Sequence, residues 1–227
     1  MSFPPYKTKT SEQWIKEYEK RDALWIHDGN PRRPHVKLRS GEHSNGFFNS
    51  ELVLQDPMLM DEVCCAILTS IMAMGQHLSN IKRIVGPAMG AITIAHDVAR
   101  HVTLRTGGVC FRAYTQKAPD GTMMFERTEI DPKDRIILVE DVITKGGSVM
   151  STAAAVEKAG GIILPYVGAI VNRSGLHAVG GKAIVALITH HMPKWSAEEC
   201  PLCAVGSGVV SDPKKNENWA RLNMPYD

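Results

Sequence analysis

Residues 137–149 read ILVEDVITKGGSV, an apolar run that meets two neighbouring acids and continues into a loop with two glycines. Continuous apolar runs of this kind are typical of strands that are buried on both faces of a parallel sheet. In α/β sheets, ligands bind beyond the carboxyl ends of the strands. Glu140 and Asp141 lie at such an end, so we expect them to face a ligand rather than to be exposed acids of an ordinary strand-to-helix turn.

The loop that follows the acids, from Thr144 to Ser148, is suited to binding a phosphate. Its glycines allow backbone N–H groups to approach an anion, and the N-terminus of the next expected helix favours negative charge. Because like charges repel, the acids must bind another part of the same ligand, either vicinal hydroxyls or a metal ion. The sequence contains neither the GxxxxGK[ST] string of a Walker A loop nor the GxGxxG fingerprint of dinucleotide-binding folds.

Short apolar segments alternate with helical stretches through most of the chain. We expect strands at 82–85, 108–112, 135–139, 162–171 and 183–188, and helices at 56–74, 92–101 and 149–159. This alternation predicts an α/β fold with a mainly parallel sheet flanked by helices. Before it, a helix is expected from Ser11 to His27 and two short strands within 35–49, while 114–128 is polar and irregular.

The length of 227 residues is compatible with one domain that has appendages. The predicted domain covers 1–227, with an N-terminal helix and a small hood at 1–50, an α/β core at 51–190 and a C-terminal extension at 191–227. The extension is a tail or a further part of the hood.

Composition excludes several classes of function. The net charge of +2 gives no sign of a nucleic-acid or membrane partner, and no apolar run approaches the roughly 18 residues of a spanning helix. The first residues contain no signal-peptide pattern. Five cysteines, two of them adjacent, are a poor basis for a disulfide framework, so a reducing cytoplasm is expected.

The string VEDVITKGGS resembles the ribose-phosphate motif of type I phosphoribosyltransferases. In that family, the acids bind the ribose hydroxyls of phosphoribosyl pyrophosphate (PRPP) and the loop binds its 5′-phosphate. The resemblance implies a type I phosphoribosyltransferase-like fold. It also implies these PRPP-binding residues: Glu140, Asp141, Val142, Ile143, Thr144, Lys145, Gly146, Gly147 and Ser148.

The segment LRSGEHSNGFFNS, residues 38–50, resembles the N-terminal hood segment of orotate phosphoribosyltransferases. Arg39 stands where that family usually has a Lys that contacts both substrates, and Phe47 and Phe48 stand at the aromatic pair beside the pyrimidine. An aromatic face suits a flat heterocycle. The alternative is that the two phenylalanines are core residues of a strand, which is expected of one of them because neighbours point to opposite faces.

Two further segments carry the same resemblance. VGPAMGAI, residues 85–92, is similar to the pyrophosphate loop of the family but is one residue shorter, and it implies that Pro87 and Ala88 bind PRPP. VNRSG, residues 171–175, is similar to the turn whose Arg pairs with the orotate carboxylate. Arg173 is therefore the expected specificity residue, with Thr144 also on the substrate, although Asn172 replaces the usual Asp. A solvated surface Arg is the alternative.

The segment FRAYTQKAPDGTMMFER, residues 111–127, falls where the family has a mobile catalytic loop. Lys117 occupies the position of the catalytic Lys, and Arg112 is expected to bind the pyrophosphate. Ala113 and Tyr114 stand where the family has an Arg-Lys pair, and Pro119 stands where it has a His. The alternative is an ordinary solvated connection between strands.

The resemblance implies transfer of a phosphoribosyl group from PRPP to orotate, giving orotidine 5′-monophosphate and pyrophosphate. The catalytic residues would be Lys117, Glu140 and Asp141. Mg²⁺ is implied as the cofactor, bound through PRPP rather than by protein side chains, and a homodimer with shared active sites is implied as the assembly. Departures at Ala113, Tyr114 and Asn172 leave open an enzyme for another base. A regulatory protein that binds PRPP without turnover is a further alternative.

The string CPLC places Cys200 and Cys203 in half of a zinc-ligand pattern. No second C-x-x-C pair is present, although His190 and His191 lie upstream and a dimer could supply another pair. A structural zinc, a turn with free thiols and a redox pair are all open.

Overall fold

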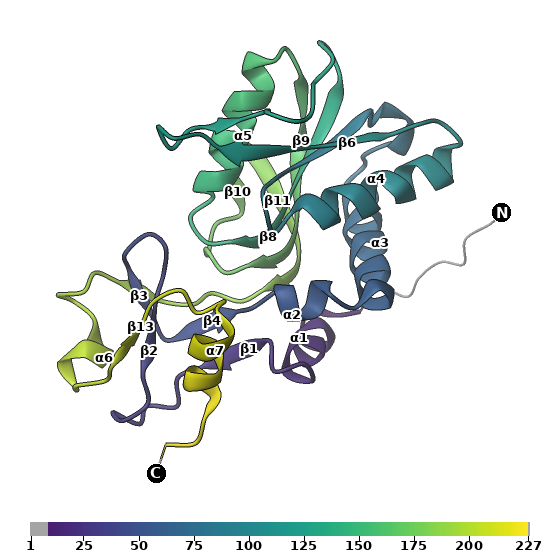
Figure 1. The fold of residues 1–227 in the computed structure, drawn as a ribbon. Helices are drawn as coiled ribbons and strands as arrows, with labels where there is room; N and C mark the ends of the chain where they lie inside the picture. Colours follow the sequence, from purple (N-terminus) through teal and green to yellow (C-terminus); the bar gives the residue numbers. More distant parts are fainter. Residues whose placement is uncertain (1–8, 227) are drawn as a thin grey trace. The chain divides into compact units, whose positions relative to one another are not determined.

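The computed structural model describes residues 9–226 (Figure 1). These residues form two compact units. The large unit contains the described residues up to Trp14 together with Leu54–His190. The small unit contains Ile15–Val53 and the residues from His191 onward, so N-terminal and C-terminal segments fold together in it.

The large unit is built on a seven-stranded sheet with the order β10-β11-β9-β8-β5-β6-β7. Neighbouring strands from β11 to β6 are parallel, and β10 and β7 pair antiparallel at the two edges. The predicted mainly parallel sheet is therefore confirmed. The strands are β5 (Arg83–Pro87), β6 (Phe111–Lys117), β7 (Met123–Met124), β8 (Arg135–Ile143), β9 (Ile162–Asn172), β10 (Ala178–Val179) and β11 (Lys182–Thr189).

Three helices flank this sheet: α3 (Pro57–Ala73), α4 (Ile92–Thr106) and α5 (Gly147–Lys158). Helices α3 and α4 pack against each other. Helix α3 also packs on β9 and β11, and α4 packs on β5 and β6. Helix α5 packs on β5, β8 and β9. Helix α3 begins where the Asp56-Pro57 pair predicts, because the Asp56 carboxylate accepts hydrogen bonds from the Met58 and Leu59 N–H groups. Among the described residues, no helix has both the length and the apolar character needed to span a membrane.

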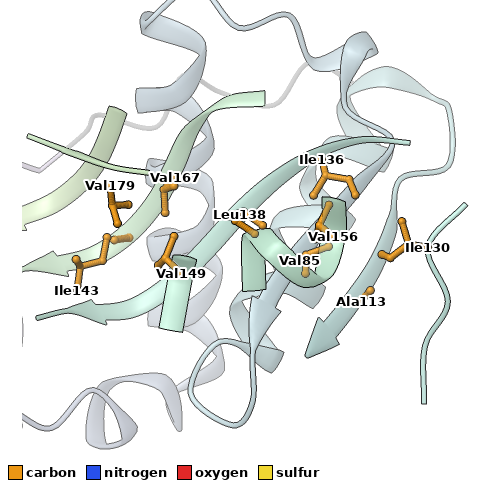
Figure 2. Packing of buried hydrophobic residues seen from close by; sticks show 12 residues of the cluster. Val85, Ala113, Ile130, Ile136, Leu138, Ile143, Val149, Val156, Val167 and Val179 are labelled. Atoms are coloured by element: carbon orange, nitrogen blue, oxygen red, sulfur yellow. The ribbon is translucent and has the colours of Figure 1, made fainter. Parts of the chain in front are cut away.

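Helices cover both faces of strand β8. Leu138 packs with Val149 and Val156 of α5 in one buried cluster (Figure 2). On the other face, Gly168 of β9 lies so close to α3 that an added Cβ would be 2.6 Å from Ile67 Cγ2 and 3.5 Å from Val139 Cγ1. Leu138 and Val139 therefore point to opposite faces, which explains the unbroken apolar run in this strand.

The small unit contains a four-stranded sheet with the order β12-β3-β2-β13 and a separate β1-β4 pair. Its buried cluster joins the two ends of the chain: Trp25 and Val36 pack with Val210 and Leu222, and Trp25 Nε1 donates to the Leu222 carbonyl at 2.8 Å. The strands are β1 (Leu24–Ile26), β2 (His35–Lys37), β3 (His43–Ser44), β4 (Gly46–Phe48), β12 (Lys194–Trp195) and β13 (Val209–Val210).

The remaining helices are short: α1 (Ser11–Glu19), α2 (Glu51–Leu54), the 3-10 helix η1 (Leu78–Asn80), α6 (Pro201–Ala204) and α7 (Asn216–Asn223). The prediction of one helix from Ser11 to His27 was wrong. Helix α1 stops at Glu19, and Leu24–Ile26 instead pairs antiparallel with β4. Pairing with a partner strand outweighs the helical periodicity of the local sequence here.

Two strands extend beyond their predicted ends. Strand β8 continues from Val139 to Ile143, so both acids lie within the strand instead of after it, and Glu140 pairs with Ala169 of β9. Strand β6 runs to Lys117 and pairs with β7, so the first part of the predicted irregular segment is a hairpin. In both cases the polar side chains suggested a loop. The backbone N–H and C=O groups of these residues are instead hydrogen-bonded to a neighbouring strand.

Candidate functional site

Two buried carboxylates lie in the last part of strand β8. Glu140 and Asp141 are 7% and 9% exposed. The Asp141 N–H donates to Glu140 Oε1 at 3.1 Å, and the Val142 N–H donates to Asp141 Oδ1 at 2.8 Å. The ladder between β8 and β5 ends at Leu138, whereas the ladder with β9 continues to Ile143. The acids therefore lie beyond the point where β5 stops pairing with β8, although β5 stays paired with β6 up to Pro87 before the chain turns toward helix α4.

That turn, residues 86–91, lies directly against Asp141. A Cβ added at Gly90 would be 2.6 Å from Asp141 Oδ2, and one at Gly86 would be 2.6 Å from Ala91 Cβ and 3.1 Å from the Val139 carbonyl oxygen. Glycine is required at these two positions because neighbouring atoms leave no room for a side chain, not because of an unusual φ angle. The Ala91 N-cap of α4 makes no side-chain cap hydrogen bond, so the first N–H groups of this helix are suited to an anion.

The other two predicted residues of this turn hold it to the sheet. Pro87 is the last residue of β5 and is buried. The Ala88 N–H donates to the Thr115 carbonyl at 2.8 Å, which ties the turn to strand β6. The turn is thus fixed on one side by β6 and on the other by contact with Asp141.

The loop from β8 to α5 has the form expected of a phosphate-binding loop. Gly146 is the N-cap of α5 with a φ of 76°, and no side chain caps the helix. A Cβ at Gly146 would lie 2.3 Å from Val179 Cγ2, so both its angle and its surroundings require glycine. Lys145, Gly147 and Ser148 are exposed, Thr144 is half-buried, and nothing lies within 4 Å of a Cβ at Gly147.

Arg173 follows strand β9 and is 1% exposed. The backbone N–H of Arg173 donates to the Ile143 carbonyl at 3.0 Å, which places the residue beside the end of β8. Burial lowers the pKa of the Arg173 guanidinium to about 10. At neutral pH the group still carries its charge, so Arg173 is a buried cation and not a solvated surface residue.

The neighbouring turn explains why an Asn stands at position 172. The Asn172 side-chain amide donates to the Leu176 carbonyl at 2.8 Å, while its oxygen accepts from the Ser174 N–H and hydroxyl at 3.1 and 2.6 Å. An Asp could accept the two hydrogen bonds from Ser174 but could not donate to Leu176. The departure from the family pattern therefore has a structural reason.

We expect Asn172→Asp to destabilise the protein by about 1–3 kcal/mol, because it leaves the Leu176 carbonyl without its donor and adds a buried negative charge. The change is measured by chemical unfolding of both proteins at neutral pH. Asn80→Asp on the exposed surface is the control and should change the free energy of unfolding by less than about 0.5 kcal/mol. Equal effects of the two substitutions would contradict the role assigned to Asn172.

Arg112 and Lys117 lie on strand β6, and both side chains are exposed. The Arg112 guanidinium is 5.4 Å from the centre of the Tyr114 ring, and Lys117 pairs with Met123 at the start of the hairpin turn. Ala113 between them is fully buried in the cluster under α5. A buried Ala cannot replace the cation that the family has at this position, so Arg112 and Lys117 are the cations that β6 can offer to an anionic ligand.

Three other predicted residues belong to the small unit. Arg39 is exposed in the turn between β2 and β3, which is closed by a hydrogen bond from the Leu38 N–H to the Glu42 carbonyl. Phe48 is 1% exposed and meets the Tyr18 ring edge-on at 5.2 Å between centroids. Phe47 is half-buried, with its ring 6.0 Å from that of Trp219. Both phenylalanines have packing roles in this unit, and their contact with a base stays a prediction.

No family model matches the chain. Curated relatives do. The chain is 35% identical over 177 residues to an orotate phosphoribosyltransferase of Pelotomaculum thermopropionicum, an alignment that covers 78% of this chain and 86% of the relative. It is 34% identical over 173 residues to that of Chlorobaculum parvum, covering 76% and 83%.

Solved structures share the fold. The orotate phosphoribosyltransferase of Aeropyrum pernix aligns with a TM-score of 0.57 at 20% identity and covers 78% of this chain and 93% of its own. The adenine phosphoribosyltransferase of Trypanosoma brucei aligns with a TM-score of 0.53 at 16% identity and covers 78% and 79%. The α/β fold with its sheet of mainly parallel strands is therefore that of type I phosphoribosyltransferases. On sequence identity and coverage, the chain belongs to the orotate phosphoribosyltransferase family.

Proposed function

We propose that this protein transfers the 5-phosphoribosyl group of PRPP to orotate, forming orotidine 5′-monophosphate and pyrophosphate in pyrimidine biosynthesis. One observation carries the proposal: a glycine loop that caps helix α5 follows two buried carboxylates, and one of them, Asp141, lies against the Gly86–Ala91 turn. The orotate phosphoribosyltransferase relatives supply the identity of the acceptor.

In this proposal each part of the site binds one part of PRPP. The loop from Thr144 to Ser148 and the first N–H groups of α5 bind the 5′-phosphate, since Lys145, Gly147 and Ser148 are exposed and the uncapped helix N-terminus suits an anion. Glu140 and Asp141 accept hydrogen bonds from the two ribose hydroxyls. The turn at Pro87 and Ala88 binds the diphosphate at the start of α4.

Bond breaking at the anomeric carbon develops positive charge on the ribose and negative charge on the departing diphosphate. The two carboxylates lie close to the first charge in this arrangement, and Arg112 and Lys117 of β6 are the cations proposed for the second. No covalent nucleophile is required. Catalysis then rests on preorganised charges and on the exclusion of water.

Mg²⁺ is the cofactor that we propose, and it would bind through PRPP rather than through protein side chains. The site fits a hard cation in its chemistry, because the oxygen donors of the Asp141 carboxylate lie against the turn that we propose for the diphosphate. When bound, the ion neutralises negative charge on the leaving diphosphate. The side chains of Glu140 and Asp141 would orient the ribose hydroxyls of PRPP.

Arg173 is the residue that we propose for the orotate carboxylate, because a guanidinium fork pairs bidentately with a planar carboxylate. Arg39, Phe47, Phe48 and Thr144 are proposed as the other substrate contacts. We also propose a homodimer that shares its active sites, with the β6–β7 hairpin as the shared segment. A cytoplasmic location is proposed too, which the absence of disulfides among the five cysteines supports.

A panel of bases tests this function. Purified protein is incubated with PRPP and Mg²⁺ plus orotate, uracil, adenine or nicotinate, and pyrophosphate release is measured with and without a chelator. Of the four bases, we expect only orotate to cause pyrophosphate release, and we expect the chelator to abolish this release. Release with another base but not with orotate would assign a different acceptor, and PRPP binding without release from any base would favour a regulatory protein.

A further inference from the structure

Four side chains of the small unit bring one ligand atom each to a common point. His35, His43, Cys200 and Cys203 place these atoms within 4.8 Å of one another. His35 Nε2 lies 2.9 Å from His43 Nδ1. Cys203 Sγ lies 3.2 Å from His43 Nδ1 and 3.5 Å from His35 Nε2, and Cys200 Sγ lies 3.6 Å from His35 Nε2.

These distances are close to the edges of a zinc tetrahedron. With Zn–N bonds of about 2.05 Å and Zn–S bonds of about 2.3 Å, tetrahedral angles put two nitrogens about 3.4 Å apart and a nitrogen and a sulfur about 3.6 Å apart. The three N–S distances of 3.2, 3.5 and 3.6 Å fall near the second value. The two nitrogens, 2.9 Å apart, would have to separate only slightly to reach the first value.

The fold brings the four residues together from two distant parts of the chain. His35 and His43 are the first residues of β2 and β3, which pair antiparallel. Cys200 is the N-cap of α6 and Cys203 lies within it, and the chain then continues to β13, which pairs with β2. The same sheet therefore fixes both the histidine pair and the cysteine pair.

The hydrogen bonds of His35 leave the correct nitrogen for a metal. Ser207 Oγ donates to the Arg33 carbonyl at 2.7 Å, so its single hydrogen is in use. Ser207 Oγ also lies 2.9 Å from His35 Nδ1, and it must accept that hydrogen bond. Nδ1 then carries the proton and Nε2 offers its lone pair to the cluster. A ligating His is typically oriented by such a bond from its other nitrogen.

Other interpretations explain less of this arrangement. A hydrogen bond between the two rings accounts for the 2.9 Å contact but not for two thiols that converge on the same nitrogens. Both thiols are free rather than joined in a disulfide. Three of the four residues are buried, His35 at 0%, His43 at 4% and Cys200 at 2% exposed, which suits a closed site better than a redox pair that must meet a partner.

We propose that His35, His43, Cys200 and Cys203 bind one structural zinc ion. Four protein ligands fill the tetrahedron and leave no position for substrate, so the site stabilises the small unit and does not act in catalysis. As zinc binds, each Sγ–H bond breaks, a Zn–S bond forms and the proton passes to water. His190 and His191, which the sequence placed nearest the cysteines, are not part of this group. The proposal is independent of the proposed enzymatic function.

Metal content is the first test. The full chain is expressed with zinc in the medium, purified without chelator and analysed by mass spectrometry for metals. We expect about one zinc per chain in the wild type, and less than about a tenth of that in the Cys200→Ser, Cys203→Ser double variant. Cys110→Ser and His96→Ala, which change residues of the large unit, are matched controls and should keep the full zinc content. Zinc-free wild-type protein, or equal loss in the controls, would overturn the proposal.

A second test uses only wild-type protein and so does not depend on how the variants fold. Chelator-treated protein is titrated with Co²⁺ in the absence of reductants that bind metals. We expect the visible bands of tetrahedral cobalt together with thiolate charge-transfer absorption, both lost when Zn²⁺ is added. Zn²⁺ should also restore the thermal midpoint that chelation lowers. Cobalt bands without thiolate absorption, or a midpoint indifferent to chelation and zinc, would contradict a His₂Cys₂ site.

Discussion

Replacing Asp141 with Asn should lower kcat/KM for PRPP by about 10²–10³-fold, the usual effect of removing one preorganised electrostatic group. The substitution keeps size and shape, and the new amide oxygen can still accept the hydrogen bond from the Val142 N–H. What it removes is the negative charge that, in the proposed mechanism, lies next to the developing positive charge of the ribose. Steady-state kinetics with varied PRPP measures the effect.

The same variant should be no less stable than the wild type, because Asp141 lies buried beside a second acid, Glu140, and the substitution relieves their repulsion. Thermal unfolding checks this. Glu157→Gln on the exposed side of α5 is the matched control, and its kcat/KM should stay within about twofold of the wild type. An Asp141→Asn enzyme with wild-type kinetics would remove the carboxylate from the mechanism.

Gly90→Ala should be nearly as damaging, with kcat/KM reduced by at least about 10²-fold, because displacement of a catalytic group by about 1 Å has effects of that size. The new Cβ would lie 2.6 Å from Asp141 Oδ2 and 2.8 Å from its Cγ, so either the carboxylate or the turn must move. Gly108→Ala is the control, since the nearest atom to its Cβ, Thr106 Oγ1, is 3.8 Å away.

A double-mutant cycle separates displacement of Asp141 from damage to the turn itself. If Gly90→Ala acts by moving the carboxylate, then it should reduce kcat/KM much less in the Asp141→Asn background than in the wild type. Losses that add in full would show that the turn contributes independently of Asp141, and the proposed contact between the two would then have no catalytic importance.

The sequence was most informative where local chemistry and fold agree. The run from Ile137 to Val149 predicted a buried strand, two ligand-facing acids and a glycine turn. The structure contains the buried strand and the glycine turn, whereas contact of the two acids with a ligand stays a prediction. The Asp56-Pro57 pair predicted the start of α3 for the same reason, because an N-cap acts within one turn of chain. Such signals need no knowledge of distant residues.

Features that depend on distant pairing could not be predicted in this way. Leu24–Ile26 follows the periodicity of the preceding helix, and only β4 makes it a strand. The contact between Gly90 and Asp141 joins a turn and a strand about 50 residues apart, and the only signal was the second glycine of VGPAMGAI. The histidines that accompany Cys200 and Cys203 lie more than 150 residues upstream, where no spacing rule reaches them.

The pairing of β2 with β13 has a consequence for biosynthesis. Val36 pairs with Val210, so after Val36 the ribosome must translate more than 170 further residues before these two strands can pair. Meanwhile the sheet of the large unit, complete by Thr189, can fold as the chain emerges. The N-terminal strands therefore remain exposed to chaperones and proteases longest, although they are made first. A nascent chain halted before Val209 would carry the complete sheet of the large unit and an unfinished small unit.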